Sequence, residues 1–499
     1  MTEFLIPAIE NLLSIDVALI LFAGTLAGLV VGALPGLSST MGVALAIPMT
    51  FGMDPKLGLI LLGAVYSSSV YGGSITAILL RTPGTDASIV TTLDGFPMTK
   101  KGLAGKAIGI STTASMIGGV TSTVALLLVA PPLARLALCF GPPEYFLVAV
   151  FGLSVIIGVS SENYLKGLII GVLGLLIATA GLDNFTGVPR FVFKSNSMLD
   201  GIPVLPALIG LFSLSQAIKL AVGAGTTLVK GDVTFSDRVL PTCDDMGKTW
   251  WVMLRSCIIG IAIGIMPGAG TSIASFLAYN EARRVSKEPE TFGKGNIQGV
   301  AAAEAANNAV VGGSLVPALT LGIPGNAVSA VFIGGLTIHG LIPGPSLFSK
   351  YGEITYTLIL SLFIANILFW VIGIAFAKYF VKIIKTPTRI LAPIICVLSV
   401  IGSYAIRGNF FDVGLLFAFG LLGYLMERFG FSPAPIVLSL ILGPMAESEL
   451  RRSLSLFHGS IVPFFERPLC LVLIALIVLT VGYPLYREFR GRKTADPTT

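Results

Sequence analysis

Two breaks in apolar sequence recur at matching places in the two halves of the 499-residue chain. Residues 28–40 contain Leu-Pro-Gly-Leu-Ser-Ser-Thr, and residues 260–272 contain Met-Pro-Gly-Ala-Gly-Thr-Ser at the same place. Residues 72–84 return as 312–325 with one residue inserted, and both copies run from Gly-Gly-Ser to Pro-Gly. Backbone groups freed from a helix inside lipid must find protein or water partners, so matched breaks predict a binding site at an interface between two repeats.

The composition predicts that the chain lies in a lipid bilayer. Hydrophobic residues make up 54% of the sequence, charged residues make up 12%, and the mean hydropathy is +0.90. A soluble globule with this composition would expose large apolar patches. Charge-free runs at 17–53, 57–80, 256–280 and 305–349 are each long enough for a span. We therefore predict an all-α polytopic membrane protein with roughly 12 transmembrane helices, some of them broken or re-entrant.

The predicted organisation is two membrane repeats joined by a polar linker. Residues 1–222 form the first repeat, with its motif region at 28–110. Residues 249–486 form the second repeat and further C-terminal helices, with a motif region at 260–345. The linker at 223–248 is the only long hydrophilic connection. We predict that the repeats are inverted, because sites built from broken helices commonly lie in inverted repeats.

Charges and reactive residues argue against several other classes. The net charge of +6 comes from basic residues scattered over short loops, which does not suggest a nucleic-acid partner. The five cysteines and two histidines form no metal-binding pattern, so neither a metal centre nor a cofactor is predicted. The start of the chain lacks the features of a cleaved signal peptide. The basic tail at 487–499 favours a cytoplasmic C-terminus.

The first pair of breaks combines a Pro-Gly step with small polar residues. Proline removes a backbone donor and glycine tolerates non-helical angles, so the chain opens there and a new helix starts at the hydroxyl residues. The N-terminus of that helix attracts carboxylate, and the freed carbonyls suit a hard cation such as sodium. The alternative is a simple kink in which the hydroxyls bond to their own helix. The predicted binding residues here are Pro35, Gly36, Ser38, Ser39, Thr40, Pro267, Gly268, Gly270, Thr271 and Ser272.

We call the opened chain at each Pro-Gly step a tip. The second pair of elements supplies further exposed backbone and could place a second tip opposite the first in each repeat. Its predicted binding residues are Thr82, Pro83, Gly84, Pro324, Gly325 and Asn326. Four tips would then surround one cavity. The small residues at the start of each element favour close helix packing, so a structural role is predicted for them. They are Gly72, Gly73, Ser74, Gly312, Gly313 and Ser314.

Asn307 and Asn308 lie in an otherwise apolar helix, where polar side chains are costly unless they are used. Their oxygens can coordinate a cation and their N–H groups can bind a carboxylate; hydrogen bonding between helices is the alternative. Glu304 either has a cation or proton role or marks the aqueous end of the helix. Arg81 is the nearest fixed positive charge to a Pro-Gly tip, although it fits a boundary residue better. The sodium candidates are Ser39, Thr271 and Asn308.

Three long segments together resemble one known family. They are residues 32–48, 71–84 and 305–325, and residues 264–270 add a fourth match. They closely resemble the large permease subunit of the tripartite tricarboxylate transporters, the TctA family, and the resemblance extends over nearly the whole chain.

The resemblance implies a permease of the bacterial inner membrane that imports a di- or tricarboxylate, citrate-like in chemistry. It also implies two partners, a small four-span membrane subunit and a periplasmic solute-binding protein. An ion gradient, typically sodium, would drive transport, and the chain contains no phosphate-binding G-x-x-x-x-G-K-[ST] loop that would suggest ATP.

Three other classes remain possible on the sequence alone. A membrane-embedded enzyme lacks an evident nucleophile with an adjacent base or a metal-binding pair. A self-sufficient symporter without a binding protein fits the motifs equally well. A passive channel or scaffold has no evident need for four capped helix breaks.

Overall fold

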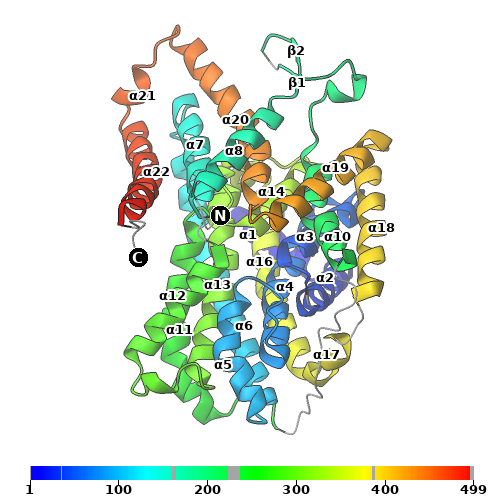
Figure 1. Cartoon of the computed structure of the whole chain (residues 1–499), viewed down its shortest axis with the longest axis vertical. Helices are drawn as coiled ribbons and strands as arrows, with labels where there is room; N and C mark the ends of the chain where they lie inside the picture. The colour runs from blue at the N-terminus through cyan, green and yellow to red at the C-terminus, as the bar shows by residue number, and fades with distance from the viewer. Residues whose placement is uncertain are drawn as a thin grey trace.

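The computed structural model describes residues 2–34, 36–159, 164–183, 185–222, 237–268, 270–384 and 388–494. These residues are almost entirely helical, with one small two-stranded hairpin (Figure 1). Pro35, residues 223–236 of the predicted linker and the last five residues of the predicted tail lie outside the described part of the chain.

The elements before the linker are α1 (Thr2–Leu12), α2 (Ile15–Ala33), α3 (Ser39–Thr50), α4 (Pro55–Leu80), α5 (Ser88–Lys100), α6 (Ala104–Ala137), α7 (Pro142–Val159), α8 (Tyr164–Ala178), β1 (Gly181–Leu182), β2 (Pro189–Arg190), η1 (Asn196–Met198), α9 (Val204–Leu208), the π-helical η2 (Ile209–Leu214) and α10 (Ser215–Val222). The elements after it are α11 (Cys243–Ile265), α12 (Gly270–Val285), η3 (Pro289–Thr291), α13 (Ile297–Leu321), α14 (Ala327–Ile338), α15 (Pro345–Ser349), α16 (Gly352–Ala375), α17 (Ala377–Ile384), α18 (Thr388–Arg407), α19 (Phe410–Arg428), α20 (Ala434–Leu456), α21 (Pro463–Glu466) and α22 (Pro468–Thr494).

Seven helices in the described residues are long and apolar enough to cross a membrane. They are α2, α4, α6, the α9–α10 unit, α11, α16 and α19. Shorter apolar helices such as α3 and α14 follow the breaks, as expected for re-entrant pieces. The chain is therefore an all-α polytopic membrane protein, as predicted. The count of roughly 12 crossings stays a prediction.

The helix starts follow from local sequence. Asp54 precedes α4, and its carboxylate accepts a hydrogen bond from the Lys56 N–H at 2.8 Å, with Pro55 in the first turn where no N–H is needed. Thr242 and Asp245 form a reciprocal capping box at the start of α11. These caps satisfy N–H groups that a helix end otherwise leaves without partners.

Helices α4 and α13 lie at the centre of the molecule and are buried along nearly their whole length. Helix α13 is rich in alanine and glycine, so α4, α6 and α11 approach it closely. Helix α4 packs against α2 as α13 packs against α11. Ser74 contacts Glu304 near the start of α13, and Tyr66 contacts Ser314 further along it. The two central helices therefore run antiparallel, which is the relation that inverted repeats require.

The outer helices of each half of the chain pack against outer helices of the other half. Helix α20 of the second half packs against α7 and α8 of the first, while η2 and α10 of the first half pack against α18 and α19 of the second. Each half therefore contributes to both outer groups, which Figure 1 shows on opposite sides of the central helices. The repeat boundaries themselves remain a prediction.

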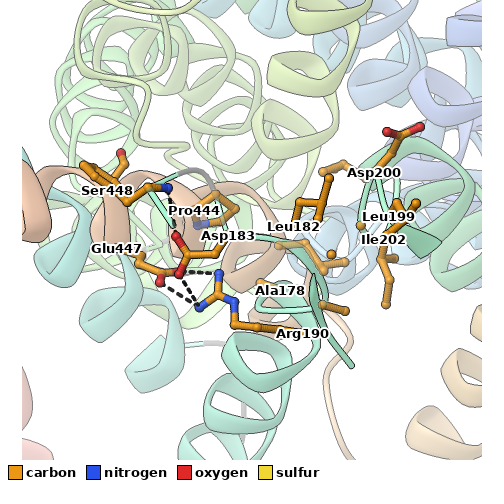
Figure 2. A pocket seen from close by; sticks show the side chains of 16 residues that line it. Ala178, Leu182, Asp183, Arg190, Leu199, Asp200, Ile202, Pro444, Glu447 and Ser448 are labelled. Atoms are coloured by element: carbon orange, nitrogen blue, oxygen red, sulfur yellow. Dashed lines mark hydrogen bonds and ion pairs between the residues drawn. The ribbon is translucent and has the colours of Figure 1, made fainter. Parts of the chain in front are cut away.

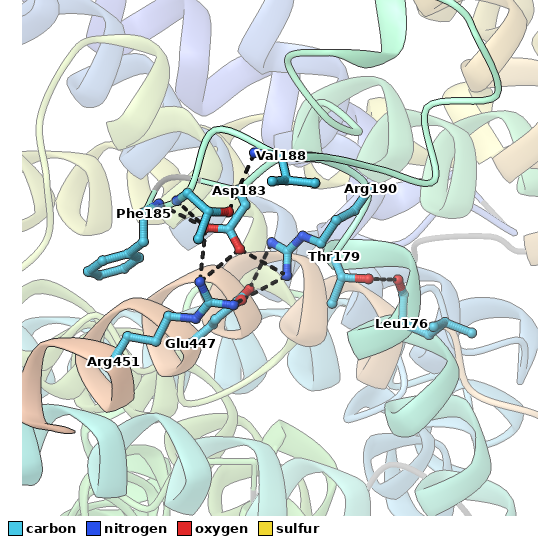
Figure 3. A network of polar contacts seen from close by, with 9 residues as sticks. Leu176, Thr179, Asp183, Phe185, Val188, Arg190, Glu447 and Arg451 are labelled. Carbon is cyan, nitrogen blue, oxygen red and sulfur yellow. Dashed lines mark hydrogen bonds and ion pairs between the residues drawn. The ribbon is translucent and has the colours of Figure 1, made fainter. Parts of the chain in front are cut away.

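The hairpin of β1 and β2 is fastened to α20 by four charged residues (Figure 3). Arg190 donates to Glu447 at 2.8 Å, and Arg451 donates to Asp183 at 2.7 Å. Arg451 also bonds to Glu447 at 2.9 Å. We call these four residues the ionic anchor. The backbone N–H groups of Phe185 and Thr186, together with Arg451, lower the pKa of Asp183 to about 2.

A pocket of about 420 Å³ lies beside this anchor (Figure 2). Asp183, Arg190 and Glu447 line it, but their charged groups point at one another. Because these charges already have partners, we assign the ionic anchor to holding the hairpin and look for the functional site elsewhere.

Candidate substrate and ion site

The first break separates α2 from α3. Gly36 is exposed and has φ +85°, a left-handed conformation that favours glycine. Ser38 caps α3 by accepting a hydrogen bond from the Met41 N–H at 3.2 Å. Ser39 and Thr40 are buried in the first turn. The local geometry is therefore an opened chain followed by a capped helix, with Pro35 outside the described residues.

The equivalent break separates α11 from α12. Pro267 and Gly268 are buried, and Gly268 has φ +76°, like Gly36 in the first copy. The Gly268 N–H donates to the Gly325 carbonyl at 2.9 Å, which joins the two tips of this repeat. Helix α12 already begins at Gly270, so Thr271 and Ser272 lie inside its first turn and are half-buried. The second helix thus starts before its hydroxyl residues, where the sequence predicted a start at them.

The second tip of the first repeat follows α4. Arg81 ends the helix in a left-handed conformation with φ 59° and is exposed. The Gly84 N–H donates to the Gly73 carbonyl at 3.2 Å, which folds the tip back on its own helix. The Thr85 N–H donates to Ser88 Oγ at 3.1 Å at the start of α5. Thr82 is half-buried and Pro83 is exposed.

The second tip of the second repeat follows α13 and is buried throughout. Asn326 and Ser329 form a reciprocal capping box at the start of α14. The Asn326 N–H donates to Ser329 Oγ at 3.0 Å, as Thr85 donates to Ser88 in the other repeat. Tyr66 of α4 joins this tip, because its hydroxyl accepts from Asn326 Nδ2 at 2.8 Å and lies 2.9 Å from Ser314 Oγ.

The packing of the glycines corrects the sequence register between the repeats by one residue. A Cβ added to Gly72 would lie 3.0 Å from the Gly32 Cα, and one added to Gly313 would lie 3.1 Å from the Gly264 Cα. Gly72 therefore corresponds to Gly313, and not to Gly312 as sequence matching predicted. Ser314 then takes the place of Gly73, and Gly325 that of Gly84.

Gly312 instead packs against α6, where its N–H donates to Ser122 Oγ at 3.3 Å. In this register residues 72–84 correspond to 313–325 with no residue inserted between them. Close packing now accounts for the small residues of both motifs.

The two pairs of tips do not meet at one point. Gly73 contacts the first-repeat tip, and Tyr66 contacts the second-repeat tip. Seven residues of α4 separate them, which corresponds to about 10 Å along the helix axis. The crossing of α4 and α13 lies between the tip pairs, so the candidate site is an elongated polar region and not a single ring of four tips.

Asn307 and Asn308 lie in that crossing and are buried. Asn308 Nδ2 donates to the Ser67 carbonyl at 3.2 Å, and Asn307 Nδ2 lies 3.5 Å from the Val70 carbonyl. The Oδ1 atoms of both side chains have no hydrogen-bond partner among the described residues. The buried hydroxyl oxygens of Ser39 and Thr82 share this condition. Such oxygens are available to a bound cation, a ligand or water.

Sequence reasoning missed Tyr66, named Thr85 only as a polar residue of its tip, and left the role of Glu304 open. Tyr66 begins a run of four polar residues within the charge-free run 57–80, so the unusual polarity of 66–69 was the available signal. Glu304 is fully buried and bonds to hydroxyls of three other helices. Nothing in the sequence paired these residues with Glu304, because their contacts are tertiary.

Inverted central helices, matched broken tips and buried oxygens without partners together define the architecture of a membrane transporter. The comparison with protein families agrees: the model of the Tripartite tricarboxylate transporter TctA family matches residues 18–438, and the chain belongs to this family.

Two proteins of Agrobacterium vitis are similar to the chain. One, described as "Uncharacterized 52.8 kDa protein in TAR-I ttuC' 3'region", is 36% identical over 472 residues, covering 95% of this chain and 94% of that protein. The other, "Uncharacterized protein in TAR-II ttuC' 3'region", is 36% identical over 234 residues, covering 47% of this chain and 97% of that protein.

Proposed function

We propose that the protein is the large permease subunit of a binding-protein-dependent secondary transporter that imports a small di- or tricarboxylate, citrate-like in chemistry. A cation gradient, sodium in our proposal, drives the import. The observation that carries this proposal is the pairing of opened, capped helix tips with buried oxygens that have no partner. Family membership supports transport of a tricarboxylate.

The anionic substrate is assigned to the helix N-termini at the tips. The starts of α3, α5, α12 and α14 present N–H groups and a partial positive charge, which favour carboxylate groups. The polar residues at these starts that we assign to the substrate are Ser38, Ser39, Thr85, Thr271 and Asn326. A substrate with two or three carboxylates can bridge neighbouring tips across the polar crossing of α4 and α13.

The cation is assigned to oxygen atoms of the same region. Sodium is a hard cation and prefers carbonyl, hydroxyl and carboxylate oxygens. Ser39 Oγ and Asn308 Oδ1 are buried and have no hydrogen-bond partner in the part of the chain that the structure describes, which supports them as ligands. Thr271 is the corresponding candidate at the second break.

We propose two protein partners, a small membrane subunit and a periplasmic solute-binding protein, because the chain belongs to a family of tripartite transporters. The apolar surface of α22 and of the outer face of α18 is available for the bilayer or for the small subunit. The proposed location is the bacterial inner membrane.

The distribution of basic residues supports an orientation in that membrane. A pocket of about 1130 Å³ lies where α5 and α12 end and α6 and α11 begin, at the end opposite the hairpin in Figure 1. It is lined by Lys101, Lys106, Lys248, Arg255, Lys287 and Lys294. Because cytoplasmic loops carry an excess of basic residues, we propose that this end and the C-terminus face the cytoplasm.

Uptake by proteoliposomes tests the proposal. The purified chain is reconstituted with and without the small subunit and binding protein, and uptake of radiolabelled citrate, succinate and other carboxylates is measured with and without an inward sodium gradient. We expect uptake only with both partners and the gradient. Uptake by the chain alone would identify a self-sufficient symporter, and uptake indifferent to sodium would remove the proposed coupling ion.

A further inference from the structure

Glu304 lies inside a cage of hydroxyl groups contributed by three other helices. Its carboxylate accepts hydrogen bonds from Ser74 Oγ of α4 at 2.6 Å and from Ser115 Oγ of α6 at 2.9 Å. Thr91 of α5 donates to the same carboxylate. Ser111 of α6 also faces it, but the Ser111 hydroxyl has no hydrogen-bond partner among the described residues. We call these five residues the Glu304 cage.

The hydrogen bonds of the cage fit an ionised carboxylate. Three hydroxyl groups lie at hydrogen-bond distance from its two oxygens, and together they can solvate an ionised carboxylate. Glu304 is completely buried, and no lysine, arginine or histidine of the described residues forms an ion pair with it. A buried charge without a partner is costly and is retained where it binds something. The cage therefore lacks one positive charge.

The hydroxyl groups give the cage the ligands that a small cation needs. A hydroxyl oxygen donates to the carboxylate in the empty cage and, after rotating, offers a lone pair to a cation. Ser111 Oγ meets no hydrogen-bond geometry with any described residue, so it is the hydroxyl of the cage that can turn to a cation most easily. A single carboxylate balances one positive charge, and an all-oxygen ligand set suits a hard ion. These properties match a monovalent cation such as sodium.

The fold does not need this polar cage. Gly72 corresponds to Gly313 by its packing. With the same offset along the two central helices, the residue of α4 that corresponds to Glu304 is Gly63. A Cβ added to Gly63 would lie 3.1 Å from Leu358 Cδ1 and 3.2 Å from Leu362 Cδ2 of α16. Those leucines thus face Gly63 as Ser111 and Ser115 face Glu304.

The two remaining cage residues are also replaced by apolar ones. In the same register, Leu315 stands for Ser74 and Phe332 stands for Thr91. Leu315, Phe332, Leu358 and Leu362 all belong to one buried hydrophobic cluster. The five cage positions, Glu304 from the second repeat and the other four from the first, thus correspond to Gly63 of the first repeat and four apolar residues of the second. The fold can therefore form this contact without polar groups, and a structural role does not explain the cage.

From this geometry we propose that the Glu304 cage is a binding site for a coupling sodium ion, separate from the oxygens of Ser39, Thr271 and Asn308, with Glu304 as the charged ligand and Ser74, Thr91, Ser111 and Ser115 as hydroxyl ligands. The proposal rests on the sodium coupling of the proposed function and names residues outside the earlier sodium candidates. Ser74 directly follows Gly73, and Thr91 lies one turn after Ser88, so both ends of the first-repeat tip contact the cage. Ion binding would fix that tip for the substrate.

Direct binding of ²²Na⁺ to the full chain in lipid nanodiscs tests the proposal. Glu304→Gln keeps the size and hydrogen-bonding capacity of the side chain but removes its charge. We expect saturable ²²Na⁺ binding to the wild type and at least about tenfold weaker binding to Glu304→Gln, because the variant loses the formal charge in a site of low dielectric. Equal affinity of the two proteins would overturn the proposal.

A milder pair of variants covers the case in which Glu304→Gln does not fold. Ser115→Ala removes one hydroxyl ligand and should weaken ²²Na⁺ binding about fivefold. Ser361→Ala is the matched control, since this buried serine lies on α16 and its hydroxyl bonds only to the Leu358 carbonyl at 2.7 Å. It should leave the affinity unchanged, and the same loss in both variants would contradict a specific site.

The same preparation separates this proposal from the proposed function. If the wild type binds ²²Na⁺ and sodium drives carboxylate uptake, but the cage variants bind sodium normally, the cage proposal fails alone. If the wild type binds no ²²Na⁺ and its carboxylate uptake does not depend on sodium, both the sodium coupling in the proposed function and the cage proposal are wrong.

Discussion

The Glu304 cage and its counterpart around Gly63 occupy equivalent places on the two central helices, yet one is charged and the other is apolar. The cage holds a carboxylate and four hydroxyls, whereas the counterpart consists of Gly63 with Leu315, Phe332, Leu358 and Leu362. The backbone architecture is preserved while the chemistry is not. The comparison indicates that the apolar counterpart stabilises the packing of the central helices, whereas the cage has the groups for the ion binding that we propose.

The largest effect on stability is expected in the apolar counterpart. Leu362→Ala leaves a cavity in the hydrophobic cluster and should lower the free energy of unfolding by about 2–5 kcal/mol. Thermal unfolding in nanodiscs measures the loss, and ²²Na⁺ affinity of the folded fraction should stay at the wild-type value. A fall in sodium affinity would show that the apolar counterpart shares the ion chemistry, which breaks the comparison.

A smaller effect is expected at the glycines that close the tips. A Cβ at Gly84 would lie 2.8 Å from the Gly73 Cα, and one at Gly325 would lie 2.6 Å from the Gly264 carbonyl oxygen. Each alanine variant should cost about 1–3 kcal/mol through overpacking. Only Gly84→Ala should also weaken sodium binding, because its tip leads into α5, which carries Thr91. Comparable sodium affinity in Gly84→Ala and Gly325→Ala would contradict this.

Tyr66→Phe should have a still smaller effect, confined to the second-repeat tip. The variant removes the hydroxyl that contacts both Asn326 and Ser314. Leaving those groups unsatisfied should cost about 1–2 kcal/mol of stability. The unfolding midpoint of Tyr66→Phe is compared with that of Tyr404→Phe, whose ring is 40% exposed. A midpoint equal to that of the control would show that the tyrosine bond does not hold this tip.

The smallest effect concerns the ionic anchor, where both carboxylates have an arginine partner, whereas the carboxylate of the cage bonds only to hydroxyl groups among the described residues. The pKa of Asp183 is lowered from 3.8 to about 2, first by the Phe185 N–H and also by Thr186 and Arg451. A lowered pKa in the folded state adds stability above pH 4 that is lost as the pH falls from about 4 toward 2.

Hydrogen exchange of residues 181–190 measures this loss. Exchange should stay slow down to about pH 4 and then rise relative to the intrinsic rate, and Asp183→Asn should remove that transition. An unchanged transition in the variant would assign the pH dependence to another group.

The sequence predicted the helical membrane class and the breaks because proline, glycine and long charge-free runs act locally. The Pro-Gly steps at 267–268 and 324–325 do open the chain between helices. The register between the repeats was wrong by one residue, since Gly72 packs against Gly32 as Gly313, and not Gly312, packs against Gly264. Sequence matching followed the repeated Gly-Gly-Ser letters, whereas the structure follows contacts with Gly32 and Gly264.

The ion chemistry was harder to predict because it depends on contacts between distant helices. Ser74, Thr91 and Ser115 lie 230, 213 and 189 residues from Glu304 and look like ordinary small polar residues in sequence. The assignment of sodium to Ser39, Thr271 and Asn308 remains a prediction.

The measurement that tests the central claim most directly is a structure of the chain in lipid nanodiscs with sodium and citrate. The account predicts density for the carboxylate groups at the helix N-termini beside Ser38 and Asn326, in the polar crossing of α4 and α13. Density for citrate only at the basic pocket between α5 and α11, with the tips empty, would contradict the account.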